Sequence, residues 1–166
     1  MRTQTLLSLA VAMVIVVAAV SASAQAPAPP PEYGTPISLE QAKKIMAGAE
    51  AEAMKNKWNV VITIVDSGGN LMMVHRLDNT QFGSIDVARD KARTAVAFRR
   101  PTKVFQDLIG QGGANLRLLN LTGASLLEGG IPIVVGGKLI GGVGVSGVTS
   151  QQDAQIAQAG IDALSK

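Results

Sequence analysis

The 166-residue sequence contains no cysteine and only one histidine, His75. A thiolate nucleophile and a disulfide framework are therefore excluded, and a zinc site would lack most of its usual ligands. Aromatic residues are also scarce, at 3% of the chain. The 15 basic and 12 acidic residues are interspersed without a cluster, so nothing in the charge pattern indicates binding to nucleic acid.

The one long apolar run lies at the beginning of the chain. The fifteen residues from Leu6 to Val20 are apolar at all but one position, follow Met1-Arg2, and end in Ala22-Ser23-Ala24. This pattern is typical of a secretory signal peptide, and the run is shorter than the roughly 20 residues needed to span a bilayer. We therefore predict a signal peptide over residues 1–24, cleaved before Gln25, and a mature protein that is periplasmic or secreted without a membrane anchor.

A proline-rich segment separates this leader from the rest of the chain. Residues 25–36, QAPAPPPEYGTP, contain five prolines, which restrict the backbone and withhold hydrogen-bond donors. They predict a semi-rigid tether without packed structure. Residues 37–166 then have the length of one ordinary domain, long enough to bury a core without disulfides.

Hydrophobic periodicity predicts an α+β domain. Ser38 and Gln41 have the spacing of a capping box at the start of the first helix, and further helices are expected over about 83–99, 104–109 and 150–164, the last capped by Ser150 with Asp153. Two hairpins are expected, from strands 59–65 with 71–77 and 131–135 with 139–145, and a weaker strand over 125–128. Five strands dominated by hairpins favour an antiparallel sheet with helices packed against it.

The glycine-rich segment Gly142–Gly147 matches G-x-G-x-x-G between a strand and a helix. A dinucleotide-binding unit would need an acidic residue on a further strand about 20 positions on, but Asp162 falls within the last predicted helix. A nucleophile elbow is also excluded, because Val148 stands where its closing glycine belongs and His75 would have to supply the base. The sequence thus favours ligand binding over nucleophilic or acid–base catalysis.

Two interpretations of these glycines stay open. They let a ligand approach the backbone, with N–H groups at the start of the last helix favouring an anionic group, or they permit close helix packing. His75 has a similar ambiguity, as a haem or metal ligand or as a polar residue at a strand end, and the pattern favours the second.

The first interpretation of the glycines defines a candidate ligand site between the glycine-rich segment and the helix over 83–99. Lys91 and Arg93 would be exposed there to meet a carboxylate, and Thr94 shares a helix face with Lys91. The candidate ligand-binding residues are Lys91, Arg93, Thr94, Gly142, Gly144, Ser146 and Gly147, with His75 as the candidate metal ligand.

Several separated motifs together carry a family resemblance. They are Asp66-Ser67-Gly68-Gly69, Arg76-Leu77-Asp78, GSIDVARDKARTA over 83–95, and GGIPIVVGGKLIGGVGVSG over 129–147 followed by Asp153. In this order they resemble the GlcG/HbpS-like family, also called the haem-degrading domain family, across roughly residues 37–164. A related domain occurs fused to cobalamin adenosyltransferases.

The resemblance implies a profilin-like α/β sandwich with a five-stranded antiparallel sheet, homo-oligomers, and haem binding in several relatives. The function it implies here is that of an exported, oligomeric haem- or tetrapyrrole-binding protein. Apolar strand and helix surfaces would hold the macrocycle, and basic or backbone groups would meet its carboxylates. The alternatives are an enzyme or accessory factor acting on a small organic acid, and an oligomeric scaffold without a ligand. The family pattern does not require a histidine at the position of His75, so the axial ligand stays open.

Overall fold

The computed structural model describes residues 29–165, so the predicted signal peptide over 1–24 lies outside the described residues. The elements follow one another along the chain as β1 (Glu32–Tyr33), α1 (Leu39–Asn56), β2 (Val61–Asp66), β3 (Leu71–Arg76), α2 (Ser84–Ala97), α3 (Lys103–Gly110), the 3₁₀ helix η1 (Gly113–Asn120), β4 (Gly130–Val135), β5 (Lys138–Ser146), α4 (Ser150–Asp162) and the 3₁₀ helix η2 (Ala163–Ser165).

The sheet has five strands, as predicted, but it is mixed rather than fully antiparallel. Strand β5 pairs antiparallel with β4 and with β2, and β2 pairs antiparallel with β3. The parallel pair joins β1 to β5, with Glu32 opposite Lys138 and Tyr33 opposite Leu139. The predicted strand over 125–128 is wrong because these residues pair with no strand. The fifth strand is β1, which lies within the segment expected to be an unpacked tether.

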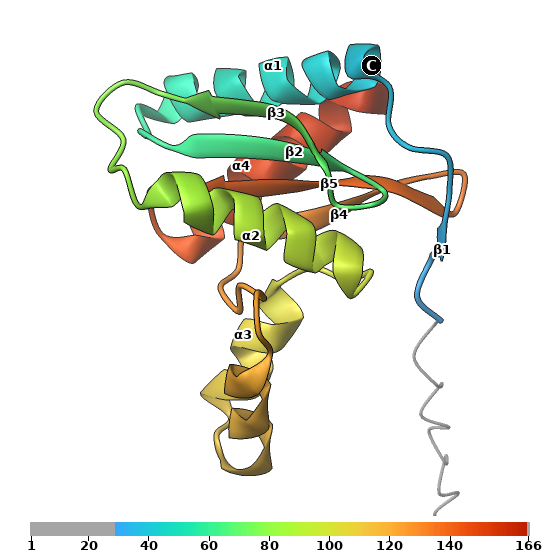
Figure 1. Ribbon diagram of the computed structural model, residues 1–166. Coiled ribbons are helices and arrows are strands. Elements are labelled where there is room, and N and C mark those ends of the chain that lie inside the picture. Colours follow the sequence, from blue (N-terminus) through green and yellow to red (C-terminus); the bar gives the residue numbers. More distant parts are fainter. Residues whose placement is uncertain (1–28, 166) are drawn as a thin grey trace, which may run out of the picture.

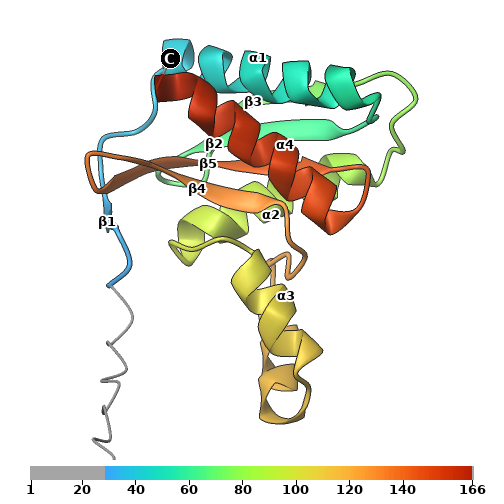
Figure 2. The ribbon, with the colours of Figure 1, turned by 180° about the vertical axis from the view of Figure 1, so that it is seen from behind.

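Helices cover both faces of the sheet. Helices α1 and α4 pack on one face and α2 on the other, as the two opposite views show (Figures 1 and 2). The larger part of the core lies on the α1–α4 face and is made of aliphatic side chains, among them Ile45, Met46, Ile62, Ile64, Val143 and Ile156. The α2 face holds a smaller cluster of Val65, Ala92, Val96 and Leu139.

Helix α1 begins as the sequence predicts. The Ser38 hydroxyl accepts a hydrogen bond from the Gln41 amide, and the Gln41 side chain accepts one from the Ser38 amide. Helix α4 has the same arrangement one residue earlier than predicted, because Thr149 and Gln152 form its capping box. The prediction that Ser150 and Asp153 cap this helix is wrong, and the Asp153 side chain is buried instead.

Glycines in β5 allow α2 to lie directly on the strand backbone. A Cβ atom at Gly144 would stand 2.0 Å from the Ala88 carbonyl oxygen, and one at Gly142 would stand 2.8 Å from the Ala92 carbonyl oxygen. These are distances that real side chains do not adopt, so only glycine permits this approach. Of the two interpretations left open by the sequence, the structure shows close helix packing.

A helical arm projects from the body of the domain. It is formed by α3 and η1 and extends away from the sheet and the other helices in both views (Figures 1 and 2). The prediction of a short helix through residues 104–109 is confirmed. Within the described part of the chain, no helix has the length and apolar character to cross a membrane.

Candidate functional site

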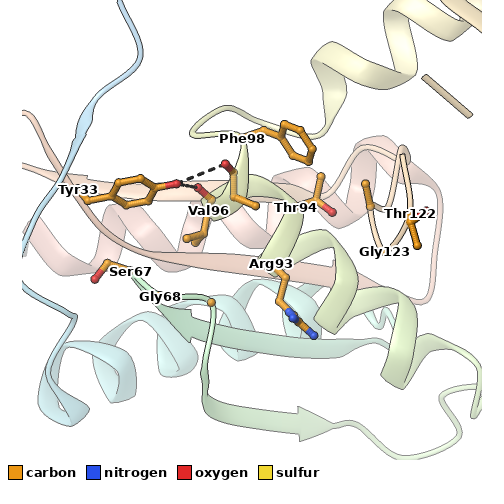
Figure 3. Close-up of a pocket in the computed structure, with 12 residues that line it drawn as sticks. Tyr33, Ser67, Gly68, Arg93, Thr94, Val96, Phe98, Thr122 and Gly123 are labelled. Carbon is orange, nitrogen blue, oxygen red and sulfur yellow. Dashed lines mark hydrogen bonds between the residues drawn. The ribbon is translucent and has the colours of Figure 1, made fainter. Parts of the chain in front are cut away.

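A pocket of about 560 Å³ lies beside the C-terminal half of α2. Its wall is assembled from four parts of the chain, namely β1, the turn between β2 and β3, the end of α2, and the loop that follows η1 (Figure 3). The residues that line it are Tyr33, Ser67, Gly68, Gly69, Arg93, Thr94, Val96, Ala97, Phe98, Thr122, Gly123 and Ala124.

The β2–β3 turn contributes Ser67, Gly68 and Gly69 to the pocket wall. The Asp66 carboxylate organises the turn by accepting hydrogen bonds from the backbone amides of Gly68 (2.8 Å) and Asn70 (2.9 Å). Burial alone would raise the pKa of this carboxyl, but hydrogen bonds from Asn70, Gly68 and Gly69 together hold it below its ordinary value. The carboxylate therefore stabilises the folded turn above the pKa of an unfolded aspartate, and that contribution is lost as the pH falls through the lowered value.

Helix α2 contributes a cation and an apolar surface. Arg93 extends from α2 on the side of the sheet (Figure 3), and a Cβ atom at Gly69 would lie 4.0 Å from its Cγ atom. It forms no ion pair or hydrogen bond with any other residue in the range 29–165. Beyond it, Val96 and Ala97 line the pocket up to Phe98, whose ring packs edge-to-face on Phe105. Arg93 is thus a cation available to an anionic ligand group beside an apolar wall.

Tyr33 closes the opposite side of the pocket. Its hydroxyl donates hydrogen bonds to the carbonyl oxygens of Val96 (3.1 Å) and Ala97 (3.3 Å) at the end of α2 (Figure 3). The Arg99 guanidinium lies over its ring, 5.5 Å from the ring centre. The predicted absence of packed structure over residues 25–36 is therefore wrong for Glu32 and Tyr33. The prolines limit backbone hydrogen bonding, but the residues between them still pair with β5.

The structure separates Lys91 from its predicted neighbours Arg93 and Thr94. Lys91 was expected to be exposed, but it is only 1% exposed. Its ammonium donates to the Val145 carbonyl oxygen (2.9 Å) and to the Asp153 carboxylate (2.8 Å). Burial raises the pKa of the Asp153 carboxyl, although the Lys91 ammonium beside it acts in the opposite direction. Lys91 is therefore committed to an internal ion pair and does not line the pocket.

The predicted space between the glycine-rich segment and α2 is occupied by the protein itself. Gly142 and Gly144 touch the backbone of α2, and a Cβ at Gly147 would stand 2.3 Å from the Asn59 carbonyl oxygen. The Ser146 hydroxyl donates to the Ser84 hydroxyl (3.2 Å) inside the domain. None of these four residues lines the pocket, and the close packing leaves no space for a ligand between Gly142 or Gly144 and α2.

Two of the predicted residues do line the pocket. Arg93 is exposed to it, while the Thr94 hydroxyl accepts a hydrogen bond from the Ser125 amide (2.8 Å) and so holds the loop after η1 in place. His75 lies on β3, where its Nδ1 atom contacts the Glu50 carboxylate of α1 at 2.6 Å. It is not a pocket residue, and among residues 29–165 no group of three histidine, aspartate or glutamate side chains is placed to hold a metal ion.

Most residues of the pocket wall were not predicted from the sequence as ligand-binding residues. The Asp66-Ser67-Gly68-Gly69 turn was recognised as a family motif, but nothing placed it opposite the end of α2. Phe98 and the loop over 122–124 carried no usable signal. Tyr33 did carry one, since a lone tyrosine among prolines has an aromatic ring to bury, but the proline content masked it.

The α+β sandwich and its pocket define a class of protein. A sheet covered on both faces supports an open cavity lined by glycines, an apolar wall and Arg93, which has no partner within residues 29–165, and such a lining suits a small organic anion. The described pocket residues include no arrangement of nucleophile and base. The class that these observations define is an α+β sandwich with an open pocket beside α2.

Comparison with known proteins identifies the family. The model of the family described as "Haem degrading protein HbpS-like" matches residues 37–162, so this chain belongs to the HbpS-like family, as the motifs predicted. A 15.0 kDa protein from Citrobacter freundii, encoded between dhaT and dhaS, is 38% identical over 133 residues, covering 78% of this chain and 93% of that protein. Protein GlcG of Escherichia coli K12 is 41% identical over 112 residues, covering 66% and 81%. A crystal structure of a PduOC–haem complex superimposes with a TM-score of 0.71 at 30% identity, covering 78% of this chain and 95% of that one.

Proposed function

We propose that this protein binds haem or a closely related tetrapyrrole in the pocket beside α2. The observation that carries the proposal is Arg93, which has no partner among residues 29–165, beside the apolar wall of the pocket, in a chain whose family is named for haem and includes a relative solved as a haem complex. A tetrapyrrole combines a flat apolar ring system with peripheral carboxylates. The pocket has an apolar wall that would contact the ring system and a separate cation, Arg93, that would contact a carboxylate.

The residues present fit such a ligand in size and chemistry. The volume of about 560 Å³ lies within the range of roughly 300–1,000 Å³ typical of ligand pockets. Gly68, Gly69 and Gly123 leave the mouth free of side chains, and Val96 and Phe98 supply apolar surface. Tyr33 is the one described lining residue of a type that ligates haem iron in other proteins. When bound, haem would supply its iron and its extended aromatic surface.

The roles of the protein groups follow from their positions. Arg93 would form a charge-assisted hydrogen bond with a ligand carboxylate, the strongest single polar contact that the lining offers. The Asp66 turn would hold its backbone close to the ligand edge without steric conflict. Thr94 would act indirectly, through its hydrogen bond to the loop at Ser125.

Titration of the purified protein with haemin, followed by the Soret band, tests the proposal. We expect saturable binding at one haemin per pocket, and Arg93→Ala should weaken it by about tenfold or more, the equivalent of one charge-assisted hydrogen bond. Arg89→Ala is the matched control, because Arg89 is an exposed arginine on the same helix, is paired with Asp86 and does not line the pocket. Absence of a Soret shift in the wild-type protein would refute the proposed function, and equal affinities for the two variants would refute the site.

We further propose that the mature protein acts outside the cytoplasm, as the apolar run and the Ala22-Ser23-Ala24 site predict. Mass spectrometry of the protein from its native host should find an N-terminus at or within a few residues of Gln25. An intact Met1 in the cytoplasmic fraction would contradict this. We also propose that the mature protein assembles into homo-oligomers through the projecting arm of α3 and η1.

A further inference from the structure

Tyr33 lies outside the part of the chain that defines the family. The family model begins at residue 37, yet Tyr33 forms one wall of the pocket. The segment that carries it is the proline-rich stretch ahead of the domain, so this wall is contributed by residues that precede the matched range. The match to the family model therefore assigns no role to Tyr33.

Several independent contacts anchor this segment. Glu32 forms an ion pair with Lys138, and the Gly34 amide donates to the Leu139 carbonyl oxygen at 2.8 Å. The Arg99 guanidinium donates to the Pro31 carbonyl oxygen at 3.4 Å. Because the segment is bound on both sides of Tyr33, the ring is held at the pocket before any ligand arrives.

One face of the ring is available to a ligand, because the Arg99 guanidinium lies over the other face, 5.5 Å from the ring centre. Tyr33 is 49% exposed, although its hydroxyl is fully engaged with the two carbonyl oxygens at the end of α2. Because the hydroxyl proton is donated to α2, the part of the Tyr33 side chain that can contact a ligand in the pocket is its aromatic surface. A half-exposed ring with a fixed orientation favours a planar aromatic ligand, because little side-chain entropy is lost on stacking.

We propose that Tyr33 is a positioning residue of the pocket, whose ring lies against a planar aromatic ligand and orients it toward Arg93. The inference rests on the proposed function, since it assumes that the ligand occupies this pocket. It adds a contact that depends on residues 29–36, ahead of the range that the family model matches. The ring should therefore raise affinity for porphyrins specifically, without being required for the fold.

The experiment uses the fact that Tyr33 is the only tyrosine in the sequence. Protein labelled with 3-fluorotyrosine gives a single ¹⁹F resonance from this ring, and zinc protoporphyrin serves as a diamagnetic probe with a strong ring current. We expect the resonance to shift in proportion to the bound fraction measured in parallel by porphyrin absorbance. Tyr33→Ala should lower the affinity for haemin by roughly three- to tenfold, the contribution typical of one aromatic contact.

Tyr33→Phe separates the two roles of the side chain. It removes the hydrogen bonds to α2 but keeps the ring, so haemin affinity should stay closer to wild type than in Tyr33→Ala, with folding of both variants checked by circular dichroism. If porphyrin binds and the ¹⁹F resonance does not move, the inference is overturned while the proposed function stands. If porphyrin does not bind the wild-type protein at all, the proposed function itself has failed.

Discussion

At the scale of single residues, Lys91 shows how a functional pattern can arise from structural need. Its three-residue spacing from Thr94 predicted one shared helix face, and that prediction is geometrically sound because both residues are buried on the inner side of α2. The spacing gives no indication of the Asp153 carboxylate. This group lies 62 residues away in sequence and accepts a hydrogen bond from the Lys91 ammonium. A long-range partner of this kind is invisible to local periodicity.

The buried pair leads to a prediction about stability. Lys91→Ala should lower the free energy of unfolding by about 3–5 kcal/mol, because it leaves the Asp153 carboxylate buried without its counterion. Urea unfolding measures this change. Lys44→Ala is the control, since Lys44 is exposed and pairs with Glu40 on the surface of α1, where the loss should be below about 1 kcal/mol. If Lys91→Ala unfolds like the wild type but loses haemin binding, Lys91 belongs to the ligand site after all.

At the scale of elements, the sequence predicted those parts whose signals are local. Both hairpins, the capping box of α1 and the central, fully buried strand β2 are confirmed, because turn residues, caps and β-branched runs act over a few positions. Strand β1 was missed because it is two residues long and is stabilised by a distant partner. The pocket depends on the same kind of long-range contact, so of its lining residues only Arg93 and Thr94 were named in advance as candidate ligand-binding residues.

The glycines of β5 give a prediction at this scale. Gly144→Ala should destabilise the domain by about 1–3 kcal/mol or more, because its new methyl group would collide with the Ala88 carbonyl oxygen and push α2 off the sheet. Thermal unfolding provides the measurement.

Gly110→Ala serves as the comparison for this variant. Gly110 lies in α3, where a Cβ would meet nothing within 4 Å, so the substitution should be neutral or stabilising by up to about 1 kcal/mol. Equal stability of the two alanine variants would show that α2 does not need this close approach.

At the scale of the whole molecule, the arm formed by α3 and η1 exposes apolar side chains that are not covered within the described residues. Leu116 and Leu119 on this arm are 47% and 63% exposed, and Leu127 beside its base is 51% exposed. Apolar side chains gathered on a projection are typical of surfaces that contact another protein. A second copy of this chain is the partner that the family resemblance implies.

We therefore predict that the mature protein is an oligomer in solution and that the arm carries the contact. Light scattering should give a mass above that of one chain, and the double variant Leu116→Glu, Leu119→Glu should lower it toward the monomer. Leu39→Glu is the control, because Leu39 is 52% exposed on α1, away from the arm. A monomeric wild-type protein at micromolar concentration would contradict the prediction.

The ion pair between Lys91 and Asp153 also joins two helices that lie on opposite faces of the sheet, α2 on one and α4 on the other. If either helix unfolded alone, the other would keep a buried charge without its counterion. The free energy of unfolding one helix while the other stays folded is therefore high. The amide protons of α2 and α4 should then exchange with solvent through the same opening event, at the free energy of global unfolding. The domain is in this sense a single cooperative unit, held across its sheet by one lysine.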